Sequence, residues 1–173
     1  MALIKKVRGV SPVFGENCYL ADNATVIGDV TVGDDCSFWF NTVIRGDVNS
    51  IRIGNKVNIQ DGAVLHCLYQ RSVIEIGDNV SVGHNVIIHG AKIHHNVLVG
   101  MGATVMDHVE IGENSIIAAG ALVLKDTEIE PNSIYAGVPA KYVKSVDPEQ
   151  TKDMINRIAD NYLMYAGWYR PDS

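Results

Sequence analysis

Apolar residues recur at every sixth position along most of this chain. Nineteen positions follow the spacing, in runs that begin at Leu20, Ile53, Ile76 and Ile93, and all nineteen are apolar. An α-helix needs a period of 3.6 residues and an amphipathic strand a period of 2, so neither explains a period of 6. Glycine, asparagine and aspartate often follow the apolar position, and they favour tight turns. The pattern therefore predicts short strands that are joined by tight turns.

The six-residue period resembles the hexapeptide repeat of the left-handed parallel β-helix. That resemblance implies an all-β prism of triangular section with three short strands per coil. Nineteen repeats at three per coil predict about six coils. The spacing is interrupted at residues 47–52 and again at residues 69–75, and both interruptions predict short loops that leave the prism.

The end of the chain carries a different pattern. Asp147, Pro148 and Gln150 fit a helix N-cap, a first helical position and a capping-box partner. Apolar and aromatic residues then recur at helical spacing, at Met154, Ile158, Tyr162, Tyr165 and Tyr169. We expect a β-helix domain over residues 1–146 and a C-terminal unit over 147–173, whose helix runs from about 148 to 167 and packs lengthwise on the prism.

Composition excludes several classes of protein. The chain has 173 residues, is 47% hydrophobic and carries a net charge of −6, with its basic residues scattered. This argues against nucleic acid or an anionic membrane as a partner. No apolar stretch is long enough for a spanning helix or a signal peptide, so we expect a cytoplasmic protein. Cys18, Cys36 and Cys67 are odd in number and far apart, which favours small core residues over disulfides or thiolate ligands.

Polar residues replace glycine in one part of the repeat. The position after each apolar residue points away from the core, and nine of these nineteen positions hold glycine or alanine. Five others, all between residues 45 and 94, hold arginine, glutamine or histidine. These five are Arg45, Gln60, His66, His89 and His94.

Three outward imidazoles without a nearby cysteine suit a zinc-type ion, and three histidines with an open position are typical of catalytic sites. Five extended residues from His89 to His94 span about 16 Å, whereas one histidine reaches roughly 6–7 Å to a metal. The two side chains also leave from different edges of the triangle. We therefore expect metal sites between the subunits of a threefold trimer. By contrast, His84, His95 and His108 are interpreted as turn residues.

Three segments carry a closer resemblance. They are VIRGDVNSIRIGNKVNIQDGAVLH, VGHNVIIHGAKIHHNVLVGMGATV and GVPAKYVK. Together they resemble the γ-class carbonic anhydrase family and its bacterial homologues, over nearly the whole chain. The resemblance implies that His66, His89 and His94 bind the metal, with His66 and His94 from one chain and His89 from its neighbour. It implies Zn²⁺, with Fe²⁺ or Co²⁺ as alternatives.

The resemblance also implies an activity and its supporting residues. The activity is the reversible hydration of CO2 to bicarbonate by metal-bound hydroxide, in a homotrimer. Gln60 would orient the hydroxide and Asn58 would support it. Ion pairs at the active site and the subunit interface would involve Arg45, Asp47 and Asp61. Tyr162 would reach the site from the helix, although packing is the favoured interpretation of this residue.

Two departures from the family pattern affect the expected rate. The founding enzyme has an acidic loop after its first histidine, with a glutamate that transfers protons, whereas the segment CLYQRSVIEIG is short and has no counterpart. Val48 stands where that enzyme has a second glutamate. Proton export would then limit turnover even with an intact metal site.

Three other functions stay open at the level of sequence. GVPAKYVK also resembles the end of hexapeptide acyltransferases, which use one interfacial histidine as a general base and bind coenzyme A along the prism. An acyl-CoA thioesterase would use the same metal-activated water on a thioester. A metal-stabilised assembly subunit would bind the ion without turnover.

Overall fold

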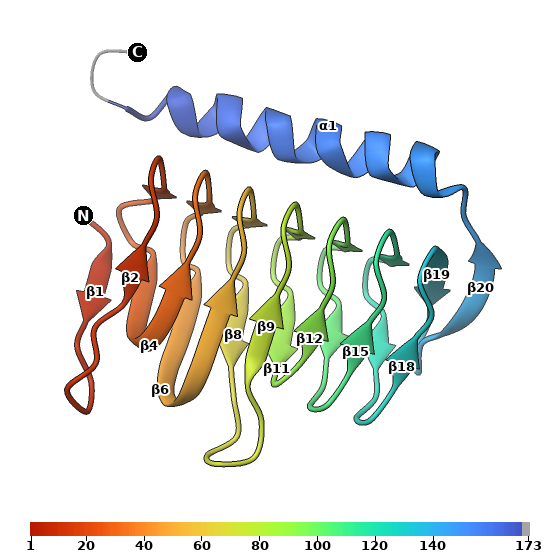
Figure 1. Cartoon of the computed structure of the whole chain (residues 1–173), viewed down its shortest axis with the longest axis horizontal. Coiled ribbons are helices and arrows are strands. Elements are labelled where there is room, and N and C mark those ends of the chain that lie inside the picture. Colours follow the sequence, from red (N-terminus) through yellow and green to blue (C-terminus); the bar gives the residue numbers. More distant parts are fainter. Residues whose placement is uncertain (171–173) are drawn as a thin grey trace.

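The computed structural model describes residues 1–170 and shows a prism of stacked strands with one long helix beside it (Figure 1). Strands of neighbouring coils pair in parallel on all three faces. The fold is the left-handed parallel β-helix that the resemblance to hexapeptide repeats implied, followed by a C-terminal helix. Domain boundaries at residues 1–146 and 147–173 stay a prediction, and residues 171–173 lie outside the described part.

The strands divide into three faces, named here in the order in which each coil visits them. The first face contains β1 (Leu3–Lys5), the start of β4 (Thr25–Val32), the start of β6 (Val43–Ile53), β8 (Val64–His66), β11 (Ile87–His89), β14 (Thr104–Val105) and β17 (Leu122–Val123). The second face contains β2 (Val13–Phe14), the ends of β4 and β6, β9 (Ile74–Ile76), β12 (Lys92–Ile93), β15 (Glu110–Ile111) and β18 (Glu128–Ile129). The third face contains β3 (Tyr19–Leu20), β5 (Ser37–Phe38), β7 (Asn58–Ile59), β10 (Ser81–Val82), β13 (Leu98–Val99), β16 (Ile116–Ile117), β19 (Ser133–Ala136) and β20 (Lys141–Ser145).

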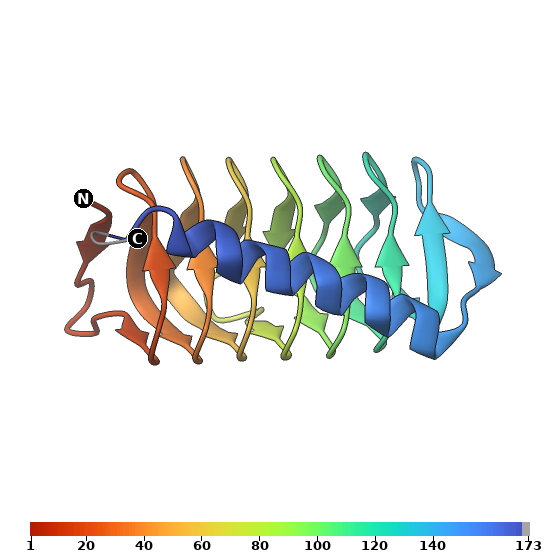
Figure 2. The same ribbon diagram turned by 90° about the horizontal axis from the view of Figure 1, so that it is seen from above.

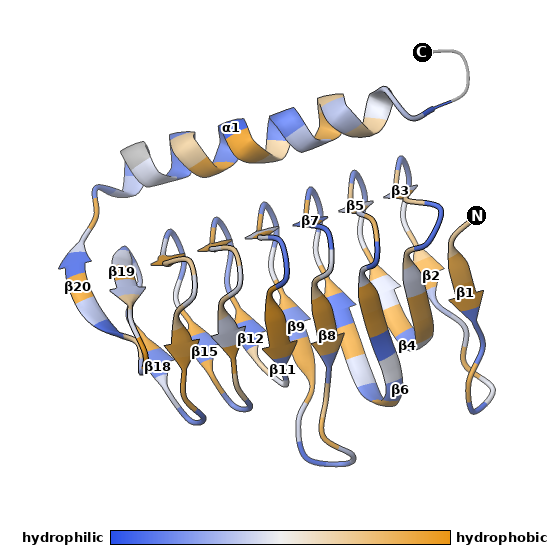
Figure 3. Cartoon of the chain, turned by 180° about the vertical axis from the view of Figure 1, so that it is seen from behind, coloured by the Kyte–Doolittle hydropathy of each residue, from blue (hydrophilic) through white to orange (hydrophobic). Residues whose placement is uncertain are grey.

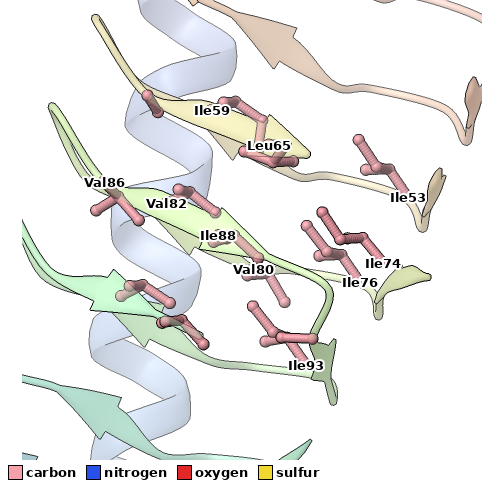
Figure 4. Close-up of a cluster of buried hydrophobic side chains, with 14 of the residues drawn as sticks. Ile53, Ile59, Leu65, Ile74, Ile76, Val80, Val82, Val86, Ile88 and Ile93 are labelled. Atoms are coloured by element: carbon pink, nitrogen blue, oxygen red, sulfur yellow. The ribbon is translucent and has the colours of Figure 1, made fainter. Parts of the chain in front are cut away.

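The repeated apolar residues fill the inside of the prism. Seventeen of the nineteen are buried, and only Leu20 and Tyr135 in the first and last coils are half-buried. Figure 4 shows side chains from all three faces meeting in this interior, among them Ile53, Leu65 and Val82. Hydrophobic and hydrophilic residues alternate along the longer strands, as the colouring in Figure 3 shows. The six-residue period therefore gives one continuous core.

The third face counts seven coils, from β3 to β19, rather than about six. The additional coil begins ahead of the repeat, where β1 and β2 pair with β4. The paired positions Ile4 and Phe14 are ten residues apart instead of six. A bridge between Val7 and Val10 marks the turn that takes up the difference. The period did not reveal this coil because its spacing is irregular.

The prediction of a loop at residues 47–52 is wrong. Strand β6 continues unbroken from Val43 to Ile53, and Ile51 is fully buried. The strand bends from the first face to the second beside β4, which bends with it. Gly28 lies at the bend with φ of 75°, and a Cβ there would meet Gly46 O at 2.3 Å. The pairing of β6 with β4 passes from Gly46 directly to Ile51, so the additional residues form an irregularity within β6.

The segment at the second interruption leaves the prism as a loop, as predicted. The segment from Cys67 to Val73 connects β8 to β9 and projects beyond the neighbouring coils (Figure 1). It is held internally by Arg71 N, which donates to Leu68 O at 3.2 Å. This segment, called the 67–73 loop below, contains no acidic residue.

Helix α1 spans Pro148–Gly167, as predicted. Asp147 Oδ1 accepts a hydrogen bond from Glu149 N at 2.9 Å, which confirms its role as N-cap. The side chain of Gln150 lies outside the description. Figure 2 shows the helix running lengthwise over the third face, where it contacts β5 and β10. Lys56 on the prism forms an ion pair with Asp160 at 2.7 Å.

The buried stripe of α1 differs from the predicted one. Among the described side chains of the helix, the buried ones are Thr151, Ile155, Ala159 and Ala166. The predicted stripe lies beside them and is partly or fully exposed, at Met154, Ile158, Tyr162, Tyr165 and Tyr169. Small residues allow the helix backbone to approach the sheet closely, and the larger side chains flank the contact.

Cys36 and Cys67 are buried, Cys18 is half-buried, and all three thiols are free. Strand β20, which the period does not predict, pairs antiparallel with β19 at the end of the third face. Within residues 1–170, no helix has the length and apolar character needed to cross a membrane.

Candidate metal centre

Arg45, His66 and His89 form a row on the first face. Strand pairing aligns Arg45 with His66 and His66 with His89 on successive coils. The two imidazoles are close together, with 3.2 Å between His66 Nδ1 and His89 Nε2. Their ring centroids are 5.3 Å apart. One chain therefore brings two of the three predicted ligands together.

Each of these imidazoles has a carboxylate on its other nitrogen. Asp47 Oδ1 lies 3.2 Å from His66 Nε2, and Asp107 Oδ2 lies 2.9 Å from His89 Nδ1. Because an ionised carboxylate only accepts hydrogen bonds, the neutral imidazoles carry their protons on those two nitrogens. His66 Nδ1 and His89 Nε2 are then lone-pair atoms that face each other. Such a pair repels unless a proton or a metal ion lies between them.

Arg45 and burial influence the protonation of Asp47 and His66 in this row. Arg45 Nη1 forms an ion pair with Asp47 Oδ2 at 2.6 Å, which places two of the predicted ion-pair residues together. Burial raises the pKa of Asp47, but hydrogen bonds and charge from Arg45 and His66 outweigh it and lower the pKa overall. Burial and the charge of Arg45 lower the pKa of His66. These effects favour a charged Asp47 beside a neutral His66.

His94 lies apart from the other two histidines. It follows β12 on the second face, where its Nε2 contacts Glu110 Oε1 at 2.6 Å. The same oxygen accepts a hydrogen bond from Lys92 Nζ at 3.0 Å. In residues 1–170 of a single chain, no group of three histidine, cysteine or acidic side chains is arranged to hold a metal.

The division of ligands between chains stays a prediction for the assembled protein. The resemblance implied that His66 and His94 come from one chain and His89 from its neighbour. Within a single chain, His66 and His89 end the same face on adjacent coils, whereas His94 ends the next face.

Gln60 and Asn58 lie on the third face and are hydrogen-bonded to each other. Gln60 Nε2 donates to Asn58 Oδ1 at 2.9 Å, and Asn58 Nδ2 donates to Ser81 Oγ at 2.7 Å. All three side chains are buried. The orientation of the Gln60 amide is thereby fixed, with its Nε2 as a donor.

Asp61 lies at the edge between the third and first faces. Its Oδ2 contacts His84 Nδ1 at 2.9 Å, and its Oδ1 accepts a hydrogen bond from Phe40 N. Within one chain, Asp61 therefore pairs with His84, a residue interpreted from sequence as a turn histidine. An ion pair of Asp61 with Arg45 stays a prediction for the assembled protein.

Tyr162 packs among aromatic rings. Its ring lies edge-on to Trp39, with 5.3 Å between centroids, and also contacts Tyr165. Burial and the charge of Asp61 raise its pKa to about 12. These contacts agree with the packing interpretation of Tyr162.

Sequence reasoning missed Asp107 and Ser72. Both side chains are buried, and Ser72 Oγ donates to Asp107 Oδ1 at 2.7 Å. Burial raises the pKa of Asp107, but its hydrogen bonds from Ser72 and His89 lower it overall. A signal was available, because Asp107 follows His89 by 18 residues, which is one coil of three six-residue repeats.

The chain is similar to proteins across several groups of organisms. It is 46% identical over 168 residues to a carbonic anhydrase of Geobacillus kaustophilus, covering 97% of this chain and 91% of that protein. The chain belongs to the γ-class carbonic anhydrase-like family of hexapeptide-repeat proteins. It is also 38% identical over 161 residues to gamma carbonic anhydrase 2 of Arabidopsis thaliana, a mitochondrial protein, covering 90% of this chain and 58% of that one.

The repeat and the fold are also found in proteins named as transferases. The model of the bacterial transferase hexapeptide matches residues 11–46 and 90–125. The crystal structure of a hexapeptide transferase family protein from Anaplasma phagocytophilum is 36% identical, with a TM-score of 0.90, and covers 97% of this chain and 98% of that chain.

Proposed function

We propose that this family member is a carbonic anhydrase-like lyase, which hydrates CO2 reversibly to bicarbonate at metal sites between the subunits of a homotrimer. The observation that carries the proposal is the pair of facing imidazole nitrogens, His66 Nδ1 and His89 Nε2, at 3.2 Å. The carbonic anhydrases among its relatives support a lyase over the other functions.

The donor set fits a divalent ion such as Zn²⁺, Fe²⁺ or Co²⁺. Two imidazole nitrogens that bind one tetrahedral zinc at about 2.0–2.1 Å lie roughly 3.3–3.4 Å apart, close to the 3.2 Å between these two atoms. Each imidazole also donates its other N–H to a carboxylate, the usual arrangement around a bound metal. His66 and His89 of one chain would therefore hold the ion together.

The third ligand in this proposal is His94 of another copy. Within its own chain His94 follows a strand of the second face, whereas His66 and His89 end strands of the first. A closed threefold assembly places one edge of each chain against a different edge of its neighbour. Three equivalent sites then form in a homotrimer. In such a site His94 must exchange its contact with Glu110 for the ion or bind through its other ring nitrogen.

The chemistry divides between the ion and the chain. A divalent ion held by three imidazoles lowers the pKa of bound water toward about 7 and so supplies hydroxide at neutral pH. Asp47 and Asp107 keep His66 and His89 in the tautomers that leave the donor nitrogens free. Gln60, whose amide is fixed by Asn58, would accept a hydrogen bond from the reacting water through Oε1.

Proton release would limit the rate. Hydration of one CO2 gives one bicarbonate and one proton, and the proton must leave the site before the next turnover. The 67–73 loop supplies no carboxylate to receive it, and Val48 is apolar. We therefore expect turnover to rise with the concentration of a small buffer such as imidazole.

The decisive experiment is stopped-flow CO2 hydration on anaerobically purified protein with its metal content measured. The His89→Ala variant should lose both metal and hydration. His95→Ala is a matched control, because His95 is an exposed histidine that accepts a hydrogen bond from Asp78 N. Full hydration by protein that contains no metal would refute the proposal.

The acyl-CoA functions are tested on the same preparation. Thiol release from a panel of acyl-CoA esters detects a thioesterase, and acetyl transfer to amines or alcohols detects a transferase. Either activity without CO2 hydration would replace the lyase proposal. A protein that holds stoichiometric metal but shows none of these activities would be an assembly subunit.

A further inference from the structure

We propose that Ser72 and Asp107 are positioning residues for His89, and that the 67–73 loop serves to hold His89 ready for the metal. This inference rests on the proposed function and deepens it, because it assigns a role to the loop that lacks the acidic residues of the founding enzyme. It concerns a chain of three hydrogen-bonded side chains, Ser72, Asp107 and His89.

The carboxylate of Asp107 is held at both oxygens. Oδ1 accepts from Ser72 Oγ at 2.7 Å, and Oδ2 accepts from His89 Nδ1 at 2.9 Å. Its side chain is only 12% exposed, compared with 25% for Asp47 beside His66 and 47% for Glu110 beside His94. A buried carboxylate with two partners has little freedom to rotate. Of the three predicted ligands, His89 therefore has the most firmly fixed carboxylate.

Ser72 fixes this carboxylate because its own hydroxyl is fixed. Ser72 Oγ accepts a hydrogen bond from Leu68 N at 2.9 Å, so its proton is directed to Asp107. The backbone of Ser72 is held as well, since Asn49 Nδ2 donates to Ser72 O at 2.8 Å. The first contact lies within the 67–73 loop, whereas the second ties the loop to β6 of the prism, where Ser72 can reach the coil that carries Asp107.

Gly90 leaves room for this chain of side chains. It follows His89 with φ of 68°, and a Cβ at this position would lie 2.2 Å from Ser72 Oγ and 2.4 Å from Asp107 Oδ1. Any larger residue would push both atoms away, as well as straining the backbone. The position directly after His89 thus allows the loop to reach Asp107.

The consequence is a fixed tautomer of His89. With Nδ1–H donated to Asp107, the lone pair of Nε2 points toward His66 before any metal binds. Removing the Ser72 hydroxyl would let the Asp107 carboxylate rotate. His89 would then also populate its other tautomer. Losses in metal affinity or activity of about 10- to 100-fold are typical when a residue behind a metal ligand is changed.

The test uses Ser72→Ala and Asp107→Asn with two readouts. Nitrogen-15 NMR of the metal-free protein reports the tautomer of His89, and competition with a chelator gives the dissociation constant for Zn²⁺. We expect mixed tautomers in both variants and a dissociation constant raised about tenfold or more. Ser37→Ala is the matched control, because it removes a buried hydroxyl that accepts a hydrogen bond from Trp39 Nε1 on the third face.

The outcomes separate this inference from the proposed function. If Ser72→Ala and Asp107→Asn leave both the tautomer and the dissociation constant unchanged, or if Ser37→Ala alters them equally, the positioning role is wrong. If the wild-type protein hydrates no CO2 while the two variants still disturb the His89 tautomer, the proposed function fails and the positioning role stands.

Discussion

The assignment of ligands to chains can be tested by mixing two inactive variants. One variant, His94→Ala, keeps His66 and His89. The other, the double variant His66→Ala/His89→Ala, keeps only His94. The structure pairs His66 with His89 at 3.2 Å in one chain, so neither variant alone can build a site. Together they can, wherever a chain of the first kind meets the edge of the second that carries His94.

The expected yield follows from counting interfaces in a threefold ring. Any trimer that contains both variants has three interfaces, and about one of the three joins the intact pair of one chain to His94 of the next. Heterotrimers isolated through two different affinity tags should therefore show about one third of the wild-type CO2 hydration and metal content. Each homotrimer of a single variant should show background values.

The assay is stopped-flow hydration with metal analysis on the same heterotrimers. Wild-type chains with the same two tags control for losses during mixing. If His66 and His94 instead act from one chain, neither variant carries both residues and the heterotrimers stay inactive. Under that division, activity would return on mixing His89→Ala with His66→Ala/His94→Ala. This result would refute the pairing of His66 with His89.

Three further predictions concern stability and reactivity. Ile88 lies in the fully buried core, so Ile88→Ala should lower the free energy of unfolding by about 2–5 kcal/mol, measured by denaturant titration. A loss below about 0.5 kcal/mol is typical of surface sites and would contradict the core assignment. Hydrogen bonding to Cys36 lowers the pKa of Cys18 to about 7, so iodoacetamide should alkylate Cys18 increasingly as pH rises through about 7. Burial raises the pKa of Cys67 to about 11, so Cys67 should not react at that pH. Equal labelling of both would contradict this. Asp147→Ala should lower the melting temperature through a cap loss of about 1 kcal/mol, and an unchanged melting temperature would exclude the cap.

Much of the fold could be predicted from sequence because one period controls it. The six-residue spacing places Ile44, Leu65 and Ile88 in one buried row. The period fails where the chain departs from it. The first coil has irregular spacing, and β6 continues through the expected loop because β4 bends with it. Both features depend on contacts between coils, which no local pattern reports.

The site was predicted in part for the same reason. The histidines were recognisable because they replace glycine in the repeat, but their neighbours on other coils were not. Asp107 lies one coil beyond His89, and Lys92 pairs with Glu110 in the same way. Counting whole coils finds both pairs. It does not find Ser72, because the 67–73 loop lies outside the repeat and only its folded path brings Ser72 to Asp107.

Strand β20 has a consequence for how long such a prism can become. A stack of parallel coils ends in a row of unpaired backbone groups, which could receive the first coil of another molecule and so build a filament. Here the third face ends in a strand of reversed direction that is exposed throughout and carries Lys141 and Lys144. An incoming parallel coil meets the wrong polarity and two positive charges. The third face thus ends in a strand that disfavours the stacking of a further parallel coil on it.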